Sequence, residues 1–185
     1  MKTLFTFLSF LFIFSLGYGQ GTESFNGTSS SSSYSSVSWT GDDGSTWNAT
    51  LSRTDQTING KAICMNDDKA NTYVLSGTIS GGIGDFTIKT QRKFSGGSGN
   101  LNIEINGTNV GTVAYSSSEQ TISINGINIS GDFTIKILNN IGGSNSGGAD
   151  RVAIDDISWT AFSGSSPLIT LSETTLTGYS YTIGN

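Results

Sequence analysis

The sequence predicts an all-β fold, and specifically a two-sheet antiparallel β-sandwich of the jelly-roll type. Many short segments alternate apolar and polar residues, as half-buried strands do. Turn dipeptides separate these segments at intervals of about 8 to 12 residues. No stretch has a convincing helical period. Short strands at this spacing are typical of sandwiches and barrels.

The alternation predicts ten strands between residues 46 and 159. Asn106-Gly107 and Asn125-Gly126 each lie between two alternating segments, and Asn-Gly is the strongest short hairpin signal. The serine-rich run at 28–36 is expected to be a flexible loop. Strands are expected at residues 46–53, 60–65, 73–79, 85–90, 100–105, 108–115, 120–124, 127–130, 132–138 and 151–159.

The hexamer GDFTIK occurs twice, at 84–89 and 131–136. Two copies of six residues do not establish a repeat architecture, and we interpret them as two strands entered by the same turn. In each copy the Phe and the Ile share one face of the strand. Phe86, Ile88, Phe133 and Ile135 are therefore expected in the core.

Residues 1–19 have the pattern of a secretory signal peptide. Lys2 precedes an apolar run, and Gly17 and Gly19 occupy the two small-residue positions of a cleavage site. The run is about 13 residues long, too short for the roughly 20 that cross a bilayer. Export to the cell exterior or cell surface is therefore expected, without membrane insertion.

Residues 20–166 are expected to form the sandwich domain. Removal of the leader takes away Lys2 and leaves eight Lys and Arg against fourteen Asp and Glu, a net charge of −6. An acidic chain lacks the electrostatic footprint of a nucleic-acid-binding protein. Cys64 has no partner for an intrachain disulfide and is expected to be a buried, inert thiol.

Residues 167–185, which begin at Pro167, alternate but end without a partner strand. Such a short segment cannot bury a core of its own. We expect it to be a linker or the truncated start of a second, Ig-like β domain. The chain is then a piece of a longer polypeptide.

The chain has no histidine, so it cannot contain a Ser-His-Asp or Cys-His catalytic site. A carboxylate pair, as in glycoside hydrolysis, is the remaining enzymatic option. Glu104 shares a polar strand face with Asn102, which indicates either a solvated side chain or one that faces a ligand. No second carboxylate is clearly placed opposite Glu104. No catalytic residue is therefore assigned, and a glycosidase or lyase is kept as an alternative.

The segment RVAIDDISWT, residues 151–160, alternates like a strand but carries Asp155 and Asp156 side by side. Successive strand residues face opposite sides, so one of the two carboxylates should point toward the core. A buried carboxylate must be paired or bind a metal. Ca²⁺ prefers oxygen ligands, and Glu23 of an N-terminal strand could meet Asp156 on one sheet edge. The alternative is pairing with Arg53, Arg151 or backbone N–H groups.

The loop Asp42-Asp43-Gly44 resembles a calcium loop only loosely, and Asp-Gly is by default a turn. Exposed aromatic residues beside polar side chains are the usual platform for sugars. Trp39 and Trp47 are more consistent with the core. Tyr34, Tyr73 and Tyr115 are the aromatic residues expected to be exposed and, with Asn102 and Glu104, to bind a ligand; Phe94 is a further aromatic candidate.

Several motifs together resemble a known class of domain. The segments ESFNG, WTGDDGSTWNATLSRTDQTINGKAI, SGGIGDFTIK, INGTNVGTV, INGINISGDFTIKI and VAIDDISWT occur in the order of a jelly-roll accessory domain of secreted Bacteroidetes proteins. Such domains are similar to carbohydrate-binding modules and to concanavalin-like and anchor-associated sandwiches. They occur beside secreted nucleases, glycosidases and proteases. The resemblance implies a non-catalytic role and a structural Ca²⁺ carried by Glu23 and Asp156.

The sequence therefore predicts a secreted module that attaches to a polysaccharide or cell-surface glycan. Its metal ligands are expected to be Glu23, Asp155 and Asp156. The alternative is a structural or adhesive spacer of a larger secreted protein, with no small ligand.

Overall fold

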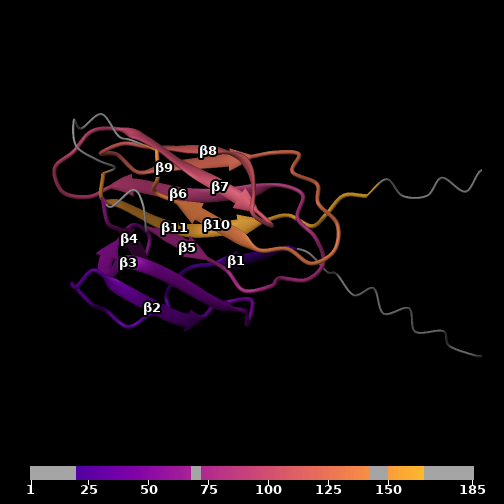
Figure 1. Ribbon diagram of the computed structural model, residues 1–185, viewed down its shortest axis with the longest axis horizontal. Helices are drawn as coiled ribbons and strands as arrows, with labels where there is room; N and C mark the ends of the chain where they lie inside the picture. Colours follow the sequence, from indigo (N-terminus) through magenta and orange to yellow (C-terminus); the bar gives the residue numbers. More distant parts are fainter. Residues whose placement is uncertain (1–19, 68–71, 142–149, 165–185) are drawn as a thin grey trace, which may run out of the picture.

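The computed structural model describes residues 20–67, 72–141 and 150–164 (Figure 1). The predicted leader and the tail from Pro167 lie outside these ranges. Within them the chain forms strands and loops, and no helix is long and apolar enough to cross a membrane. The strands are β1 (Gly21–Glu23), β2 (Ser35–Thr40), β3 (Thr46–Thr57), β4 (Lys61–Met65), β5 (Tyr73–Leu75), β6 (Phe86–Arg92), β7 (Gly99–Ile105), β8 (Thr108–Tyr115), β9 (Gln120–Ile124), β10 (Ile135–Leu138) and β11 (Val152–Trp159).

All strand pairs are antiparallel, and their order is β8-β7-β10-β5-β3-β4-β11-β6-β9, with β1 on β11 and β2 on β3. The long strand β3 joins the two layers. Its first half pairs with β5 and its second half with β4. The order folds back so that β8 and β9, at its two ends, lie beside each other (Figure 1). The predicted antiparallel β-sandwich is confirmed.

The core between the layers contains the residues that alternation assigned to it. Phe86, Ile88, Phe133 and Ile135 are each at most 1% exposed. Trp39 and Trp47 also lie in the core, where they stack with ring centroids 6.3 Å apart. Burial of each such side chain contributes about 1.5–3 kcal/mol to folding.

Of the two predicted hairpins, one is present. Asn106 and Gly107 link β7 to β8 with φ angles of 52° and 75°, the pair of positive values that a type I′ turn needs. The second prediction is wrong, because no strand follows Gly126. The amide of Gly126 instead donates to Asp85 Oδ1 at 2.7 Å, and the chain continues as an irregular connection held by the Ile129–Ile83 bridge.

The predicted serine-rich loop at 28–36 ends two residues earlier than expected, and a strand that was not predicted, β2, follows it. Strand β2 begins at Ser35, and its inward residue Trp39 packs against Phe25 at a centroid distance of 5.6 Å. Serines on the outer face of β2 hide the alternation, because small polar residues give a weak strand signal.

A β-bulge in β11 explains how the strand accommodates two adjacent aspartates, Asp155 and Asp156. Asp156 and Ile157 of β11 both stand opposite a single residue of β6, and Asp156 has a left-handed φ of 44°. The bulge shifts the alternation by one residue, so Ile154 and Ile157 both enter the main core. Asp155 is fully buried and Asp156 is half-buried. Neither points into the main core, so the prediction that one of them would do so is wrong.

On the opposite side of β11 from the main core, a smaller apolar cluster contains Ala62, Cys64 and Ala153. Cys64 is fully buried there, and burial raises the pKa of its thiol to about 11. An unreactive thiol is expected from such an environment.

Candidate functional site

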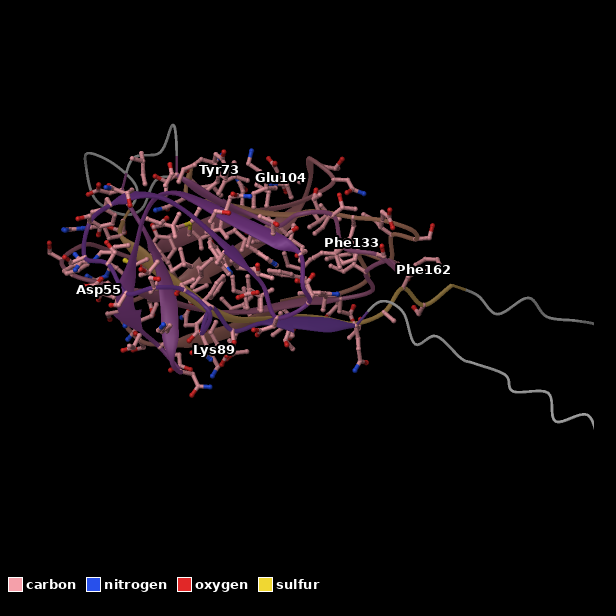
Figure 2. All side chains as sticks on the ribbon, turned by 90° about the horizontal axis from the view of Figure 1, so that it is seen from below. Asp55, Tyr73, Lys89, Glu104, Phe133 and Phe162 are labelled. Atoms are coloured by element: carbon pink, nitrogen blue, oxygen red, sulfur yellow. The ribbon has the colours of Figure 1, made fainter. Side chains whose placement is uncertain are left out.

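Three of the predicted ligand residues meet on one outer sheet face. Tyr73 of β5, Glu104 of β7 and Asn102 of β7 all point away from the core, because their neighbours Val74, Ile103 and Ile105 point into it. Figure 2 shows Tyr73 and Glu104 close together on one side of the sandwich, with Lys89 on the opposite side. We call the outer surface of β5, β10, β7 and β8 the tyrosine face.

Lys136 of β10 connects the aromatic and acidic members of the tyrosine face. Its Nζ lies 4.9 Å from the centroid of the Tyr73 ring, within range of a cation–π interaction. The same Nζ lies 3.9 Å from Glu104 Oε2. The ion pair with the Lys136 ammonium group makes this part of the face neutral.

An amide network continues the tyrosine face toward its edge. Asn102 Nδ2 donates to Asn140 Oδ1 at 2.7 Å, and Asn109 Nδ2 donates to Asn102 Oδ1 at 3.0 Å. Each amide keeps further donor or acceptor capacity, because a primary amide has two N–H groups and two carbonyl lone pairs. These groups can form hydrogen bonds with hydroxyl groups of a ligand.

The tyrosine face extends into a shallow hollow over β2, β3 and β5. The hollow has a volume of about 360 Å³. Strand register places its residues in line with Lys136 and Glu104, because cross-strand partners share a face. The resulting row across six strands is Ser38, Asn48, Leu75, Lys136, Glu104 and Asn109. Beside this row, Tyr73, Thr50 and Ser36 also line the hollow.

Tyr115 is not on this face, and the expectation that it is exposed is wrong. It is 1% exposed, and its hydroxyl donates to Asp150 Oδ2 at 3.3 Å. Burial raises the pKa of Tyr115 to about 12. The sequence contains a signal for this placement, since Tyr115 has the same strand parity as the buried Val113.

Tyr34 lies elsewhere, just before β2, and is half-buried rather than exposed as expected. Its ring lies 5.5 Å from the guanidinium carbon of Arg53, and its hydroxyl is buried without a hydrogen-bond partner. Burial raises the pKa of Tyr34 above its usual value.

Glu23 is 1% exposed, and N–H groups satisfy its carboxylate. Its Oε1 accepts from the amide of Phe25 at 2.7 Å and from Trp39 Nε1 at 3.2 Å. Its Oε2 accepts from the amide of Asp42 at 2.9 Å. Burial raises the pKa of Glu23, and these donors offset part of the rise. Glu23 thus fastens β1 to the Asp42–Asp43 turn, in which Asp43 Oδ1 accepts from Ser45 in the manner of an Asx-turn.

Asp155 has a similar environment at the end of the β3–β4 hairpin. It is fully buried, and its two oxygens accept from the amides of Asn59 at 2.9 Å and Asp156 at 2.8 Å. Burial raises the pKa of Asp155.

Asp156 forms an ion pair on the surface of the β6–β11 pair. Its Oδ2 lies 3.0 Å from Lys89 Nζ and accepts from Asn59 Nδ2 at 2.9 Å. Partial burial acts to raise the pKa of Asp156, but the hydrogen bonds from Asn59 and Lys89 lower it overall.

The three acidic residues do not form a calcium cage as placed. Glu23 and Asp156 line the same small hollow of about 180 Å³, as the sequence suggested. However, their oxygens and those of Asp155 accept N–H groups, and Lys89 supplies the positive charge at Asp156. In the part of the chain that the structure describes, no three acidic, Cys or His side chains are grouped to hold a metal. The contacts follow the alternative of pairing within the protein.

Comparison with known proteins assigns the fold. No protein-family model and no curated protein matches the chain. Among solved structures, the chain is similar to the CBM36-1 domain of a multidomain xylanase from the hindgut metagenome of Trinervitermes trinervoides, with a TM-score of 0.51 and 16% identity, over 77% of this chain and 98% of that chain.

Two further structures are more distantly similar. They are the carbohydrate-binding module CBM36 in complex with calcium and xylotriose (TM-score 0.48, 14% identity, 68% of this chain and 99% of that chain) and the CBM35 from Paenibacillus barcinonensis (TM-score 0.43, 20% identity, 69% and 98%). At such low identity the likeness to the CBM36-1 domain establishes the fold and nothing further. This chain has the jelly-roll fold that is found in carbohydrate-binding modules.

Proposed function

We propose that this protein is an exported, non-catalytic module that binds a neutral polysaccharide or cell-surface glycan through the tyrosine face. The observation that carries the proposal is the row of side chains, polar at every position except Leu75, that runs across six strands beside the Tyr73 ring. An extended polymer needs an extended surface, and this row provides hydrogen-bonding groups on five of its six strands.

The chemistry of the tyrosine face suits a sugar. Tyr73 and Leu75 offer apolar surface to the C–H face of a sugar ring, while Asn48, Asn102 and Asn109 offer amides to hydroxyl groups. The Lys136–Glu104 ion pair is internally neutral, which favours an uncharged ligand. Glu104 is paired with the Lys136 ammonium group, whereas a glycosidase acid works with a second carboxylate.

A spacer without a small ligand is the second candidate function. It is favoured by the presence of a single aromatic ring, Tyr73, among the residues that define the tyrosine face, and by the position of Lys136 over that ring. A spacer needs no accessible stacking platform. The presence or absence of glycan binding distinguishes the two functions.

Calcium stays a prediction from the sequence, as do the secretory leader, the Bacteroidetes origin and the second domain after Pro167. A calcium ion at Glu23, Asp155 and Asp156 would have to displace Lys89 and several N–H groups. The proposed glycan binding uses the opposite side of the sandwich and does not depend on this metal.

The experiment is an affinity-electrophoresis panel of soluble neutral polysaccharides, which starts with xylan because the similar CBM36-1 domain comes from a xylanase. We expect retardation of the wild-type chain by at least one polymer and loss of retardation in Tyr73→Ala. Ser123→Ala, on the exposed surface of β9, is the control and should behave as wild type. Absence of retardation across the panel, with the protein folded, favours the spacer.

A further inference from the structure

The chain contains three arginines, and all three contact Phe94. The guanidinium carbon of Arg151 lies 4.7 Å from the centroid of the Phe94 ring, and that of Arg53 lies 5.1 Å from it. Arg92 donates through Nη1 to the Phe94 carbonyl oxygen. Residues 53, 92 and 151 are far apart in sequence, so this convergence is created by the fold. We call Phe94, the three arginines and Tyr34 the arginine patch.

Phe94 is placed as a ligand contact would be placed. At 45% exposure it is the one large hydrophobic side chain that stands exposed in residues 20–67, 72–141 and 150–164. Its φ of 62° is in the left-handed region, which costs a bulky residue free energy and persists only where the surroundings enforce it. An exposed ring in a strained conformation contributes little to the core. Such outliers are concentrated at functional sites.

The arginine patch has unused hydrogen-bonding capacity. Asp55 holds Arg53 through Nε and Nη2, at 2.6 and 2.5 Å, which fixes the guanidinium plane and leaves Nη1 free of that pair. Arg151 Nε is 3.9 Å from Asp67, longer than a hydrogen bond. Arg92 donates through Nη1 to the Phe94 carbonyl oxygen, and its Nε is buried, so Arg53 and Arg151 are the arginines with N–H groups available to a ligand.

The arginine patch is a local concentration of positive charge on an acidic chain. Lys93, the residue before Phe94, adds a fourth cation, and its Nζ donates to the Thr57 carbonyl at 2.7 Å. Asp55 and Asp67 pair with Arg53 and Arg151, and the buried Asp150 lies near Arg92, so three carboxylates offset three of the four positive charges. Guanidinium groups bind carboxylate and sulfate through planar, paired hydrogen bonds, which a lysine cannot reproduce.

We propose that the arginine patch is a second binding site, which takes a carboxylate- or sulfate-bearing sugar unit of an acidic polysaccharide. Arg151 and Arg53 receive the anionic group, and Phe94 contacts the apolar face of the sugar ring. Tyr34 positions Arg53, whose guanidinium carbon lies 5.5 Å from its ring. The polymer class rests on the proposed glycan-binding function, whereas the preference for an anionic group rests on the arginines. The site shares no residue with the tyrosine face, and it carries positive charge where the tyrosine face carries a neutral ion pair.

The test measures the affinity of the full chain for two matched polymer pairs. Dextran sulfate and dextran differ in sulfate, while polygalacturonate and its methyl ester differ in free carboxylate. We expect binding of at least one charged polymer and none of its neutral partner. Arg151→Gln should weaken that binding about tenfold or more, the effect of losing a charge-assisted hydrogen bond.

Lys61→Gln is the matched control, because it removes one positive charge outside the arginine patch. It should change the affinity less than twofold. Equal losses in Arg151→Gln and Lys61→Gln would overturn the proposal, since they would indicate non-specific attraction. Absence of binding to both charged polymers would also overturn it. Tyr73→Ala should retain the anionic binding, so that failure of the proposed function is distinguishable from failure of this site.

Phe94→Gly separates a binding role from a structural one. Glycine tolerates positive φ, so the variant should melt no lower than wild type while it loses affinity for the charged polymer. A lower melting temperature with unchanged affinity would mean that Phe94 and the arginines only stabilise their loop, and would overturn the proposal.

Discussion

Lys89 Nζ lies 3.0 Å from Asp156 Oδ2 across the antiparallel pair of β6 and β11. This lysine belongs to the first GDFTIK copy, and Asp156 lies in the bulge of β11. The bulge turns Asp156 outward at the point where Lys89 can reach it. The positive charge that faces Asp156 in the structure is therefore the Lys89 ammonium group.

Melting with excess Ca²⁺ and with EDTA tests this assignment. A ligand that does not bind the folded state cannot stabilise it, so we expect the same melting temperature in both conditions. A rise of several degrees in calcium would contradict the pairing and support the calcium prediction. In that case Asp156→Ala should abolish the rise.

The raised pKa values of Glu23 and Asp155 predict a pH dependence of stability. Burial raises both, so the folded state binds more protons than the unfolded state between the ordinary carboxyl pKa, near 4, and the raised values. Stability from these two groups is therefore fully present below pH 4 and is lost as the pH rises through their folded pKa values.

Asp55 and Asp156 have the opposite effect on the pH dependence of stability, and their effect falls in a lower pH range. The hydrogen bond from Arg53 lowers the pKa of Asp55 to about 2, and the pKa of Asp156 is also lowered. Their contribution is present above about pH 4 and is lost below it. Melting temperatures should consequently rise as the pH is lowered toward about pH 4, through the raised pKa values of Glu23 and Asp155, and should fall at lower pH. Glu23→Gln should make the melting temperature less dependent on pH above about pH 4. An unchanged pH dependence in that variant would contradict the assignment to Glu23.

Gly41 is the position at which an added methyl group should be most harmful to the turn that holds Glu23. A Cβ there would collide with Glu23 Oε2 and would lie 2.5 Å from Trp47 Cδ1. We expect Gly41→Ala to destabilise the fold by about 3 kcal/mol, the upper range for overpacking. The control Gly27→Ala has a nearest atom at an ordinary 3.5 Å and should be within about 0.5 kcal/mol of wild type. Urea unfolding measures both, and equal stabilities would contradict the packing described.

Tyr115→Phe tests whether Tyr115 is structural. The change removes the buried 3.3 Å hydrogen bond to Asp150, which should cost about 1 kcal/mol of folding free energy. Affinity for any bound glycan should be unchanged, because the hydroxyl is inside the sandwich. A loss of affinity without a loss of stability would restore Tyr115 to the binding site.

The predictable parts of the structure were those set by local alternation. The inward Phe86 and Phe133, the hairpin at Asn106-Gly107 and the outward Glu104 all follow from period-two alternation or turn chemistry. Strand parity also indicates burial of Tyr115, because it shares the parity of the buried Val113.

The remaining features depend on contacts between distant segments. The bulge at Asp156 inverts parity, and period-two alternation gives no sign of an inserted residue. The arginine patch joins three arginines that lie on separate strands or at strand ends. Only the strand order brings them together, so Phe94 could be selected as an aromatic residue but not as the centre of a cluster.

The central claim is that a glycan binds on the tyrosine face, and backbone chemical-shift mapping tests it most directly. A ¹⁵N-labelled chain would be titrated with a soluble oligosaccharide of the polymer that retards it, beginning with a xylan fragment. We predict shifts at the amides of Tyr73, Glu104 and Lys136. Shifts confined to the hollow beside Gln20 and Trp159 at the end of the sandwich, or no shifts with any fragment, would contradict the account.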